Sequence, residues 1–477
     1  MSHKTENCYI NSKPCMQLPD GPQTPSLLQT LQLIAQPTKF LDSCAQRYGD
    51  TFTTRVLGLN SPPVVFFSDP QAIQEIFTLP SSGFDFRKAT HVFEPLMGSL
   101  SLILQEGRSH QRTRQLMMPP FHGDRMKGYG KLICEITESA IANWQTDSCF
   151  SIHKVMPEIT LQIILRVVFG IEPGPRYQQL EKLLSALLED VTTPWYSSLF
   201  FFPPLQQDLG PWSPWGSFLR RRSTIDSLIY AEIAERRELA YESRTDILSM
   251  LMSARDENGE AMSDTQLRDQ LVSLLLLGYE TTAAALAWAF YWILSSPGVL
   301  TRVQTELDAL GDNPEPGAIA QLPYLTAVSA ETLRVNPIAL ICTPRMAKEP
   351  LQVAGYDLEK GAILIPCIYV AHRCQKVYPN PEEFQPERFL ERKFSPYEYL
   401  PFGGGSRGCI GTAFSMFEMK LVLATILGRF QLELTQKSPV RPIRRGITIV
   451  PSGGVPVVVR SDQPKAGALC AIAASGL

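Results

Sequence analysis

The amino-acid sequence predicts a mainly α-helical protein with minor β-sheets, organised as one large helical domain with a small β-rich N-terminal portion. Long stretches of helical periodicity fill the middle of the chain, whereas short runs of β-branched and aromatic residues lie in an early segment and towards the C-terminus. No Gly/Ser-rich linker, internal repeat or long charge run divides the 477 residues. Length alone would suggest about three domains, although single domains of this size exist. Because no domain boundary is visible, we expect one domain with a large core.

The early β-rich portion consists of two short apolar runs on either side of a turn-like LNSPP. Helices are predicted where apolar residues recur every three or four positions, and short strands return near the end of the chain. The strand runs are TFTTRVLG (51–58) and PPVVFF (62–67), followed much later by runs within PLQVAGYDLEKGAILIP (350–366) and ITIVPSGGVPVVVR (447–460). The predicted helices cover residues 126–144, 177–191, 264–294 and 301–310.

The two ends of the chain differ in composition from its body. Residues 1–25 are polar and proline-rich, and we expect a flexible lead-in there. Residues 461–477 are biased towards small residues, and we expect a disordered tail. The domain itself is therefore expected to span residues 26–460.

Residues 191–222 are unusually dense in aromatic residues and prolines. The prolines argue against a regular element in this segment. Two interpretations remain open, namely an ordinary crossing of the core or a flexible apolar flap over a pocket or on a membrane surface.

Composition excludes several classes of function and location. A formal charge of −3 gives no reason to expect nucleic acid as a partner. No run of about eighteen apolar residues predicts a transmembrane anchor, and the N-terminus lacks the apolar region of a signal peptide. The ten cysteines are scattered without disulfide spacing, and Cys367, His372 and Cys374 are expected to be ordinary buried residues. We therefore expect a soluble, cytoplasmic protein.

The ten residues FGGGSRGCIG (402–411) raise the question of which chemistry they carry. Gly403, Gly405 and Gly408 fit the GxGxxG pattern of dinucleotide sites, but no apolar strand precedes them and the Walker lysine is absent. Alternatively, inward-facing N–H groups and the start of a helix near Gly411 would favour the ionised thiolate of Cys409. Such a thiolate is well suited to bind iron.

The stretch matches FxxGxRxCxG in full and so resembles the haem-thiolate family, cytochrome P450. The resemblance implies the cytochrome P450 fold, haem b as the cofactor and Cys409 as the axial ligand of the haem iron. It implies cofactor-binding roles for Phe402, Gly403 and Gly411 in the same loop. The chain as a whole looks most like soluble bacterial members, in particular cyanobacterial hydroxylases of long-chain fatty acids or terpenes.

Two further segments carry the resemblance beyond the cysteine loop. In the predicted helix YLTAVSAETLRV, Glu331 and Arg334 lie three residues apart and can form a charged pair, which alone would usually be a solvated pair. The resemblance adds Arg388 from FQPERF as the third member of a structural core beside the haem pocket. In the apolar helix LLLLGYETTAAALAWAF, Glu280 calls for a partner or a purpose.

In that apolar helix the resemblance places Gly278, Glu280 and Thr281 over the iron, with Gly278 in contact with the cofactor. The threonine hydroxyl can bond a carbonyl of the preceding turn and locally open the helix. Glu280 and Thr281 are then the expected catalytic residues for proton delivery, together with Cys409. Leu277 departs from the small residue that the family usually has there, and its bulk is expected to narrow the oxygen groove or to press on the substrate.

Four cationic side chains are expected to bind the haem propionates. In EGRSHQRTRQLMMPPFH, His110 and Arg114 lie one helical turn apart, a spacing that would otherwise suit a surface pair. The resemblance assigns both to a propionate, and Arg345 and Arg407 to the same task, for which the bidentate geometry of arginine suits carboxylates.

The resemblance implies a monooxygenase that inserts one oxygen atom of O2 into a C–H bond. The apolar segments that it places at the pocket favour a hydrophobic substrate, either a long-chain fatty acid or a terpenoid. The chain after Cys409 is too short for a reductase domain, so a separate ferredoxin and its ferredoxin reductase are expected to supply electrons to a monomeric enzyme. The alternatives are a peroxide-driven hydroxylase or hydroperoxide isomerase, and a non-enzymatic haem-binding sensor.

An acidic electron donor would need positive charge around the cysteine. The residues Arg108, Arg112, Lys127, Lys131 and Lys420 either form such a surface or are scattered solvated charges.

Overall fold

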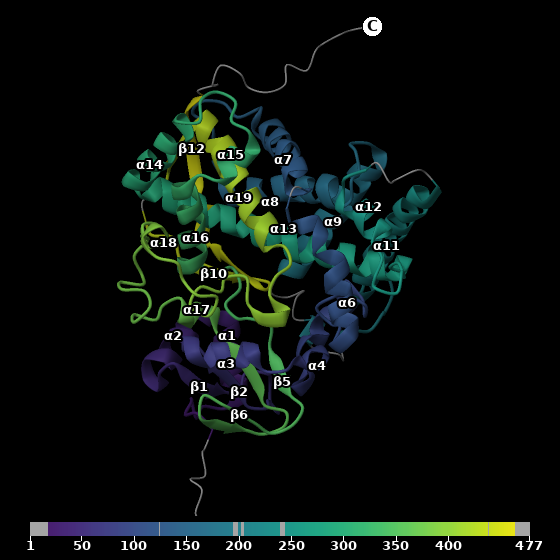
Figure 1. Ribbon diagram of the computed structural model, residues 1–477, viewed down its shortest axis with the longest axis vertical. Coiled ribbons are helices and arrows are strands. Elements are labelled where there is room, and N and C mark those ends of the chain that lie inside the picture. Colours follow the sequence, from purple (N-terminus) through teal and green to yellow (C-terminus); the bar gives the residue numbers. More distant parts are fainter. Residues whose placement is uncertain are drawn as a thin grey trace, which may run out of the picture.

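The computed structural model describes residues 18–123, 125–193, 199–201, 205–238, 244–436 and 438–462. Within them the protein is mainly helical with small sheets, as predicted. Figure 1 shows β1, β2, β5 and β6 at one end of the molecule with α1–α3, and the larger helical part at the other end. Most of the expected lead-in, residues 1–17, and of the expected tail, residues 463–477, lies outside the described residues.

The helices include all four that the sequence predicts, with shifts of a few residues at their ends. Their bounds are α1 Ser26–Ala35, α2 Pro37–Tyr48, α3 Pro70–Thr78, α4 Phe86–Thr90, α5 Glu94–Met97, α6 Gly107–Met117, α7 Arg125–Ile141, α8 Ile152–Ile163, α9 Pro175–Thr192, α11 Pro214–Glu238, α12 Ile247–Ser253, α13 Asp264–Ser295, α14 Pro297–Asp308, α15 Pro316–Ala320, α16 Pro323–Val335, α17 Ile368–Ala371, α18 Arg388–Glu391 and α19 Thr412–Arg429.

The largest sheet joins the early strands to strands from much later in the chain. Its order is β1-β2-β8-β5-β3, with β1 and β2 forming an antiparallel hairpin and β2 pairing in parallel with β8. Alternate residues of β2 enter two separate cores, one against α2 and one against α3. The strands are β1 Thr51–Thr54, β2 Val64–Phe67, β3 Phe84–Asp85, β5 Arg345–Ala347 and β8 Ile363–Pro366.

Three smaller sheets lie elsewhere, and one of them contributes to the site. The hairpin β10–β11 packs directly against α13, whereas β4, β12 and β9 form a three-stranded sheet in that order. Strand β12 extends two residues past the expected end of the domain at residue 460. The bounds are β4 Cys149–Ser151, β6 Leu351–Val353, β7 Tyr356–Leu358, β9 Phe430–Leu434, β10 Pro442–Arg445, β11 Thr448–Pro451 and β12 Pro456–Asp462.

The 32-residue helix α13 runs through the centre of the helical part and contacts α8, α16 and α19. A capping box fixes its start, because Ser263 and Gln266 bond each other's backbone N–H groups. Among the described helices, α13 alone is long and apolar enough to cross a membrane, but 67% of its most apolar stretch is buried inside the protein. It is therefore placed as a core helix.

The aromatic segment 191–222 is partly regular, contrary to the prediction from its prolines. Helix α11 begins at Pro214, a position where the missing N–H costs nothing because it would have no helical partner. The rings of Phe200, Trp215 and Phe218 pack with centroids 5.0–5.6 Å apart in the core. These three belong to a core crossing, and residues 194–198 and 202–204 lie outside the described part.

Candidate active site

The cysteine loop is a tight turn whose glycines allow its shape. Gly403 and Gly405 have φ angles of 68° and 63°, values that favour glycine. A Cβ on Gly404 would lie 2.2 Å from the ring of Phe77. The Cys409 N–H donates to the carbonyl of Phe402 at 2.9 Å, and α19 begins three residues later at Thr412. The loop therefore presents a cysteine at a helix start, without the preceding strand of a nucleotide site.

The surroundings of Cys409 only partly favour a thiolate. Desolvation raises the pKa of its thiol, whereas the Gly411 N–H, the Thr412 hydroxyl and Arg114 lower it. Desolvation outweighs these three groups, which corrects the expectation that the loop alone favours the ionised form. The residue keeps accessible surface, unlike buried Cys342 and Cys367. A bound metal cation would supply the stabilisation that the thiolate needs.

The four side chains that the resemblance assigns to the propionates, those of His110, Arg114, Arg345 and Arg407, lie around this loop or belong to it. Arg114 donates to the carbonyl of Gly408 at 2.7 Å, and Arg345 donates to the carbonyl of Thr343 at 3.0 Å. The guanidinium of Arg407 lies 3.9 Å from the ring centre of Phe86, and its buried Nε and Nη1 have no hydrogen-bond partner among the described residues. Such unpaired donors call for an anionic ligand.

The pKa shifts of these side chains also indicate a site for an anionic ligand. Burial, followed by the charges of Arg407 and Arg114, lowers the pKa of His110 to about 4. Burial lowers the pKa of Arg407 to about 10, while Glu106 opposes this shift. Mutual repulsion and desolvation thus destabilise these charges until carboxylates lie beside them.

The middle of α13 carries the acid–threonine pair. The Thr281 hydroxyl donates to the carbonyl of Leu277 at 2.6 Å, the bond expected from the sequence. The helix nevertheless stays continuous from Asp264 to Ser295, so the hydroxyl does not open it. From α8, the Thr160 hydroxyl donates to the carbonyl of Tyr279 at 3.2 Å and so ties this segment to its neighbour.

Glu280 has a partner that sequence reasoning missed. It is 8% exposed, and its Oε1 lies 3.7 Å from Nε of Arg445 on β10. Burial raises the pKa of Glu280 to about 7, against the lowering effects of Arg445 and Thr448. Arg445 also donates to Nε2 of His153 at 3.0 Å and to the Thr192 hydroxyl at 3.2 Å.

Only a weak sequence signal could have indicated Arg445. It stands in the basic run RPIRRG within an otherwise apolar hairpin. No signal singles out His153, whose pKa is lowered to about 4 by burial and by Arg445. Arg445 shows that the acid faces the β10–β11 hairpin, and His153 of α8 lies next to Arg445.

The charged triad of the ExxR motif joins α16, which carries Glu331 and Arg334, to Arg388 of α18. Arg334 donates twice to Glu331, at 2.7 and 2.8 Å, with both side chains fully buried. Nε of Arg388 lies 3.5 Å from Glu331 Oε1. The remaining donors of Arg334 bond the carbonyls of His372, Pro381 and Glu383, so the pair fastens the segment before the cysteine loop to α16.

Nearby, His372 accepts from the Leu400 N–H through Nε2 at 3.0 Å, as a core histidine does. Burial lowers its pKa to about 3. Among the described residues no group of three possible ligands could hold a metal ion.

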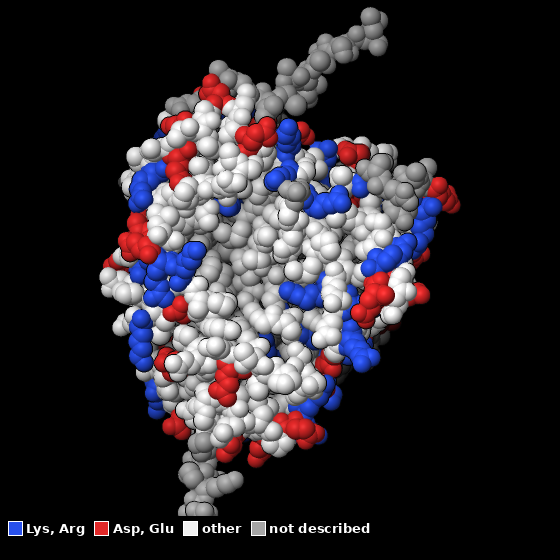
Figure 2. All heavy atoms as spheres, in the orientation of Figure 1, with Lys and Arg blue, Asp and Glu red and all other residues white. Residues whose placement is uncertain are grey.

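An accessible stretch interrupts the burial of α13. Leu276, Leu277, Gly278, Tyr279 and Thr281 are partly exposed, whereas most of the helix on either side is buried. Figure 2 shows this face of the molecule hollowed near its centre, with mostly uncharged residues in the hollow and Lys and Arg around it. The middle of α13 therefore offers a mostly apolar, accessible surface on which an apolar ligand can pack.

The positive surface expected around the cysteine is smaller than the sequence suggests. Lys420 is only 9% exposed and donates to Ala320 and Thr326, so it serves α15–α19 packing. Arg112 is paired with Asp256, and Lys131 lies 4.0 Å from Glu315. Of the five expected cations, Lys420 is too buried to belong to a surface that meets a partner, and Arg112 and Lys131 lie beside acidic residues of the same chain.

Comparison with known proteins settles the family. The family model described as "Cytochrome P450" matches residues 19–456. The chain is a member of the cytochrome P450 family. A cytochrome P450 is a haem-thiolate monooxygenase, so the protein is an enzyme and its cofactor is haem b.

Two curated mycobacterial relatives are similar over most of the chain. "Putative cytochrome P450 135B1" of Mycobacterium tuberculosis is 37% identical over 94% of this chain and 92% of its own length. "Putative cytochrome P450 137" of the same species is 35% identical over 87% of this chain and 84% of its own length. The names give the family and no substrate, and they agree with the expected bacterial type.

Solved structures show the same fold. The cytochrome P450DA haem domain superposes with a TM-score of 0.80 at 23% identity, covering 94% of this chain and 97% of its own. Retinoic acid-bound cyanobacterial CYP120A1 superposes with a TM-score of 0.80 at 24% identity, covering 93% of this chain and 99% of its own. The expected cytochrome P450 fold is thereby confirmed.

The residues present fit haem b. Its propionates would supply carboxylate acceptors for the buried, unpaired Nε and Nη1 of Arg407. Its iron would supply the cation that stabilises a thiolate at the accessible sulfur of Cys409.

Proposed function

We propose that this cytochrome P450 inserts one oxygen atom of O2 into a C–H bond of a long-chain fatty acid or terpenoid. The observation that carries the proposal is the accessible, apolar middle of α13, where Leu277 and Tyr279 flank Gly278 beside the acid–threonine pair. Binding of an apolar substrate in the chamber that this stretch lines is favourable, because it removes apolar surface of the substrate from water.

Each cofactor contact is assigned to a residue of this chain. Cys409 would bind the haem iron through its thiolate, and His110, Arg114, Arg345 and Arg407 would bind the propionates. Phe402, Gly403, Gly411 and Gly278 would contact the macrocycle. Haem, when bound, supplies the redox chemistry, in which O2 is reduced so that one oxygen atom enters the substrate and the other leaves as water.

Thr281 and Glu280 deliver protons to the chamber. The Thr281 hydroxyl is held by the carbonyl of Leu277, which orients it beside the accessible stretch. With a pKa of about 7, Glu280 can both hold and release a proton near neutral pH. Glu331, Arg334 and Arg388 keep the structural role of holding the cysteine-side segment.

The substrate class is supported by a structural relative. CYP120A1 was solved with retinoic acid, an apolar isoprenoid acid, and its fold superposes on this chain. Leu277 adds bulk at the chamber, where its side chain packs against the core and remains partly exposed. These features favour an extended apolar substrate over a compact polar one.

We further propose that a ferredoxin, reduced by a ferredoxin reductase, donates the electrons to a monomeric, cytoplasmic enzyme. Arg108, on the first turn of α6 and exposed, stands near His110 and could meet an acidic partner. The free cysteines among the described residues are consistent with a reducing compartment.

The first test is Cys409→Ser, with Cys149→Ser, an exposed cysteine on β4, as the control. The reduced carbon monoxide complex of the parent and of the control should show the red-shifted band of a thiolate ligand. Its loss only in Cys409→Ser supports the assignment, and its persistence there refutes it.

The second test is a binding screen of fatty acids and terpenes, read by the shift of the resting haem spectrum. Binders are then tested for oxidation with a ferredoxin, its reductase and O2, and separately with hydrogen peroxide. Oxidation with hydrogen peroxide but not with the ferredoxin, its reductase and O2 would replace the proposal with a peroxide-driven hydroxylase.

A further inference from the structure

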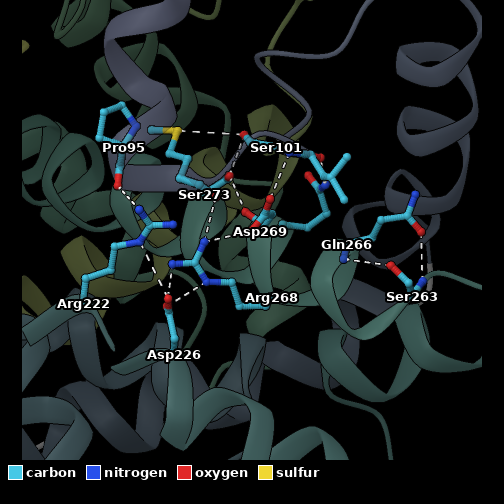
Figure 3. Close-up of polar contacts among 12 residues, drawn as sticks. Pro95, Ser101, Arg222, Asp226, Ser263, Gln266, Arg268, Asp269 and Ser273 are labelled. Carbon is cyan, nitrogen blue, oxygen red and sulfur yellow. Dashed lines mark hydrogen bonds and ion pairs between the residues drawn. The ribbon is translucent and has the colours of Figure 1, made fainter. Parts of the chain in front are cut away.

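The loop between α5 and α6, residues 98–105, is fastened to α13 by side chains that the catalytic site does not use. Figure 3 shows this polar cluster, in which Ser101 of the loop faces Asp269 and Ser273 of α13. The same loop precedes His110 on α6 and carries Leu102 and Ile103, two partly exposed apolar residues packed against the main core.

Gln270 holds two main-chain groups of the loop with its two amide atoms. Its Oε1 accepts from the Leu102 N–H at 2.9 Å, and its Nε2 donates to the Leu100 carbonyl at 2.6 Å. The amide thus pairs with the loop as a neighbouring strand would. Because the oxygen must accept and the nitrogen must donate, only an amide of this length satisfies both groups.

Asp269, the adjacent residue on α13, holds a third main-chain group. Its Oδ2 accepts from the Leu100 N–H at 2.9 Å. The loop approaches this carboxylate closely, because a Cβ on Gly98 would lie 2.1 Å from Asp269 Oδ1. Ser101 and Ser273 add a hydroxyl pair at 2.7 Å.

Two arginines extend the cluster to α11. Arg268 donates to Asp269 Oδ1 at 2.8 Å and through Nε to Asp226 Oδ1 on α11 at 2.7 Å. Arg222 of α11 donates to the carbonyl of Pro95 in α5 at 2.5 Å. One network therefore joins α11, α13 and the loop, with its α13 members buried and its α11 members partly exposed.

The cost of this arrangement argues for a positioning role. Side chains of Arg268 and Asp269 are 3% and 4% exposed, and such buried charges often stabilise a fold no better than apolar residues of the same size would. The network instead specifies one conformation of the loop, because each of its hydrogen bonds forms only in that conformation.

We propose that Gln270 and Asp269 are positioning residues that fix the loop so that Leu102 and Ile103 define the shape of the substrate chamber. Gln270 lies eleven residues before Thr281 on the same helix, about 16 Å along its axis. We call the hydrogen bonds that join Gln270 and Asp269 to the loop the latch. By fixing the loop, the latch sets the length of apolar substrate that the chamber admits. This inference rests on the proposed function, in that the accessible stretch of α13 is taken to line the chamber.

The test compares Gln270→Met with Gln266→Met in the haem-loaded enzyme. Gln266 is the same residue type on the same helix, but it belongs to the capping box and its bonds are to Ser263. Methionine keeps the length of the side chain and removes both the acceptor oxygen and the donor nitrogen of the amide.

The first measurement is amide hydrogen exchange of residues 98–106. Gln270→Met should speed exchange at Leu102 at least tenfold, whereas Gln266→Met should leave it unchanged. Unchanged exchange in Gln270→Met would overturn the latch.

The second measurement is binding of two haem-ligating probes of different length, 1-phenylimidazole and 1-dodecylimidazole. The ratio of their Kd values should change at least threefold in Gln270→Met and stay constant in Gln266→Met. Faster exchange with an unchanged ratio would refute the positioning role.

Failure of both probes to shift the parent haem spectrum would count against the proposed chamber, while the exchange result would still decide the latch. If Gln270→Met does not fold, Gln270→Glu serves instead for the ratio of Kd values, because it keeps the acceptor for the Leu102 N–H and replaces the donor to the Leu100 carbonyl with a second acceptor. An unchanged ratio in that variant would refute the positioning role.

Discussion

Glu280 of α13 and Arg445 of β10 form an ion pair, with 3.7 Å between Oε1 and Nε. Burial raises the pKa of Glu280 to about 7, and the guanidinium keeps it from rising further. The carboxyl oxygen Oε1 has no hydrogen-bond partner among the described residues. The pair therefore holds a carboxyl group close to the point where it gains or loses a proton at neutral pH.

Arg445→Gln should raise the pKa of Glu280, because the removed charge favours the ionised carboxyl. If protonated Glu280 supplies protons, the fall in activity at high pH should move upward by roughly one pH unit. The measurement is the pH profile of substrate oxidation with a surrogate ferredoxin and reductase.

Arg444→Gln is the matched control for this shift. Arg444 lies next to Arg445 on the same strand but donates to the Gly446 carbonyl. A profile that moves equally in both variants, or in neither, would remove Arg445 from the proton path.

Local patterns made part of this site predictable. The Glu331–Arg334 pair lies at helical spacing, and the buried acid interrupts an apolar run on α13, so neighbouring residues reveal both. Arg445 and Gln270 could not be found in this way, because each meets its partner only through the packing of distant segments.

The same limit applies to the fold. The hairpin β1–β2 follows from two apolar runs around a turn, whereas the parallel pairing of β2 with β8 has no local signal. The start of α11 at Pro214 was missed because a proline that breaks a helix interior is well accommodated in a first turn.

Thr281→Ala should divert reduced oxygen to hydrogen peroxide, because the hydroxyl that donates to Leu277 is lost from the accessible stretch of α13. The fraction of consumed reductant recovered as peroxide should rise several-fold, while Thr281→Ser should restore coupling. Thr282→Ala is the control, since Thr282 is buried and faces Ser415 of α19. Equal uncoupling in both alanine variants would indicate a structural effect on α13.

Arg334→Lys should destabilise the protein by about 3 kcal/mol, because an ammonium group cannot replace the planar donors that reach Glu331 and three carbonyls. Arg302→Lys is a fitting control, since its pair with Glu387 is about half exposed and such pairs contribute up to about 1 kcal/mol. Urea unfolding of both variants, followed with haem absorbance, measures the difference. A similar loss in the free energy of unfolding in both variants would show that the buried triad stabilises the fold no more than an exposed pair does.

Glu418→Gln should change how stability depends on pH. Glu418 of α19 is 2% exposed, its Oε1 has no hydrogen-bond partner among the described residues, and burial raises its pKa from 4.5 to about 8. Between these two values the folded protein keeps a proton that the unfolded chain releases, so the free energy of unfolding falls as pH rises from about 4.5 to about 8.

The neutral amide of Glu418→Gln has no proton to release, so this fall should be smaller in the variant by on the order of 3 kcal/mol between pH 5 and pH 8. Urea unfolding at the two pH values gives the comparison, with Glu359→Gln as the control because Glu359 is exposed after β7. An identical pH dependence in parent and Glu418→Gln would mean that Glu418 titrates normally, which would place a compensating charge or water beside it.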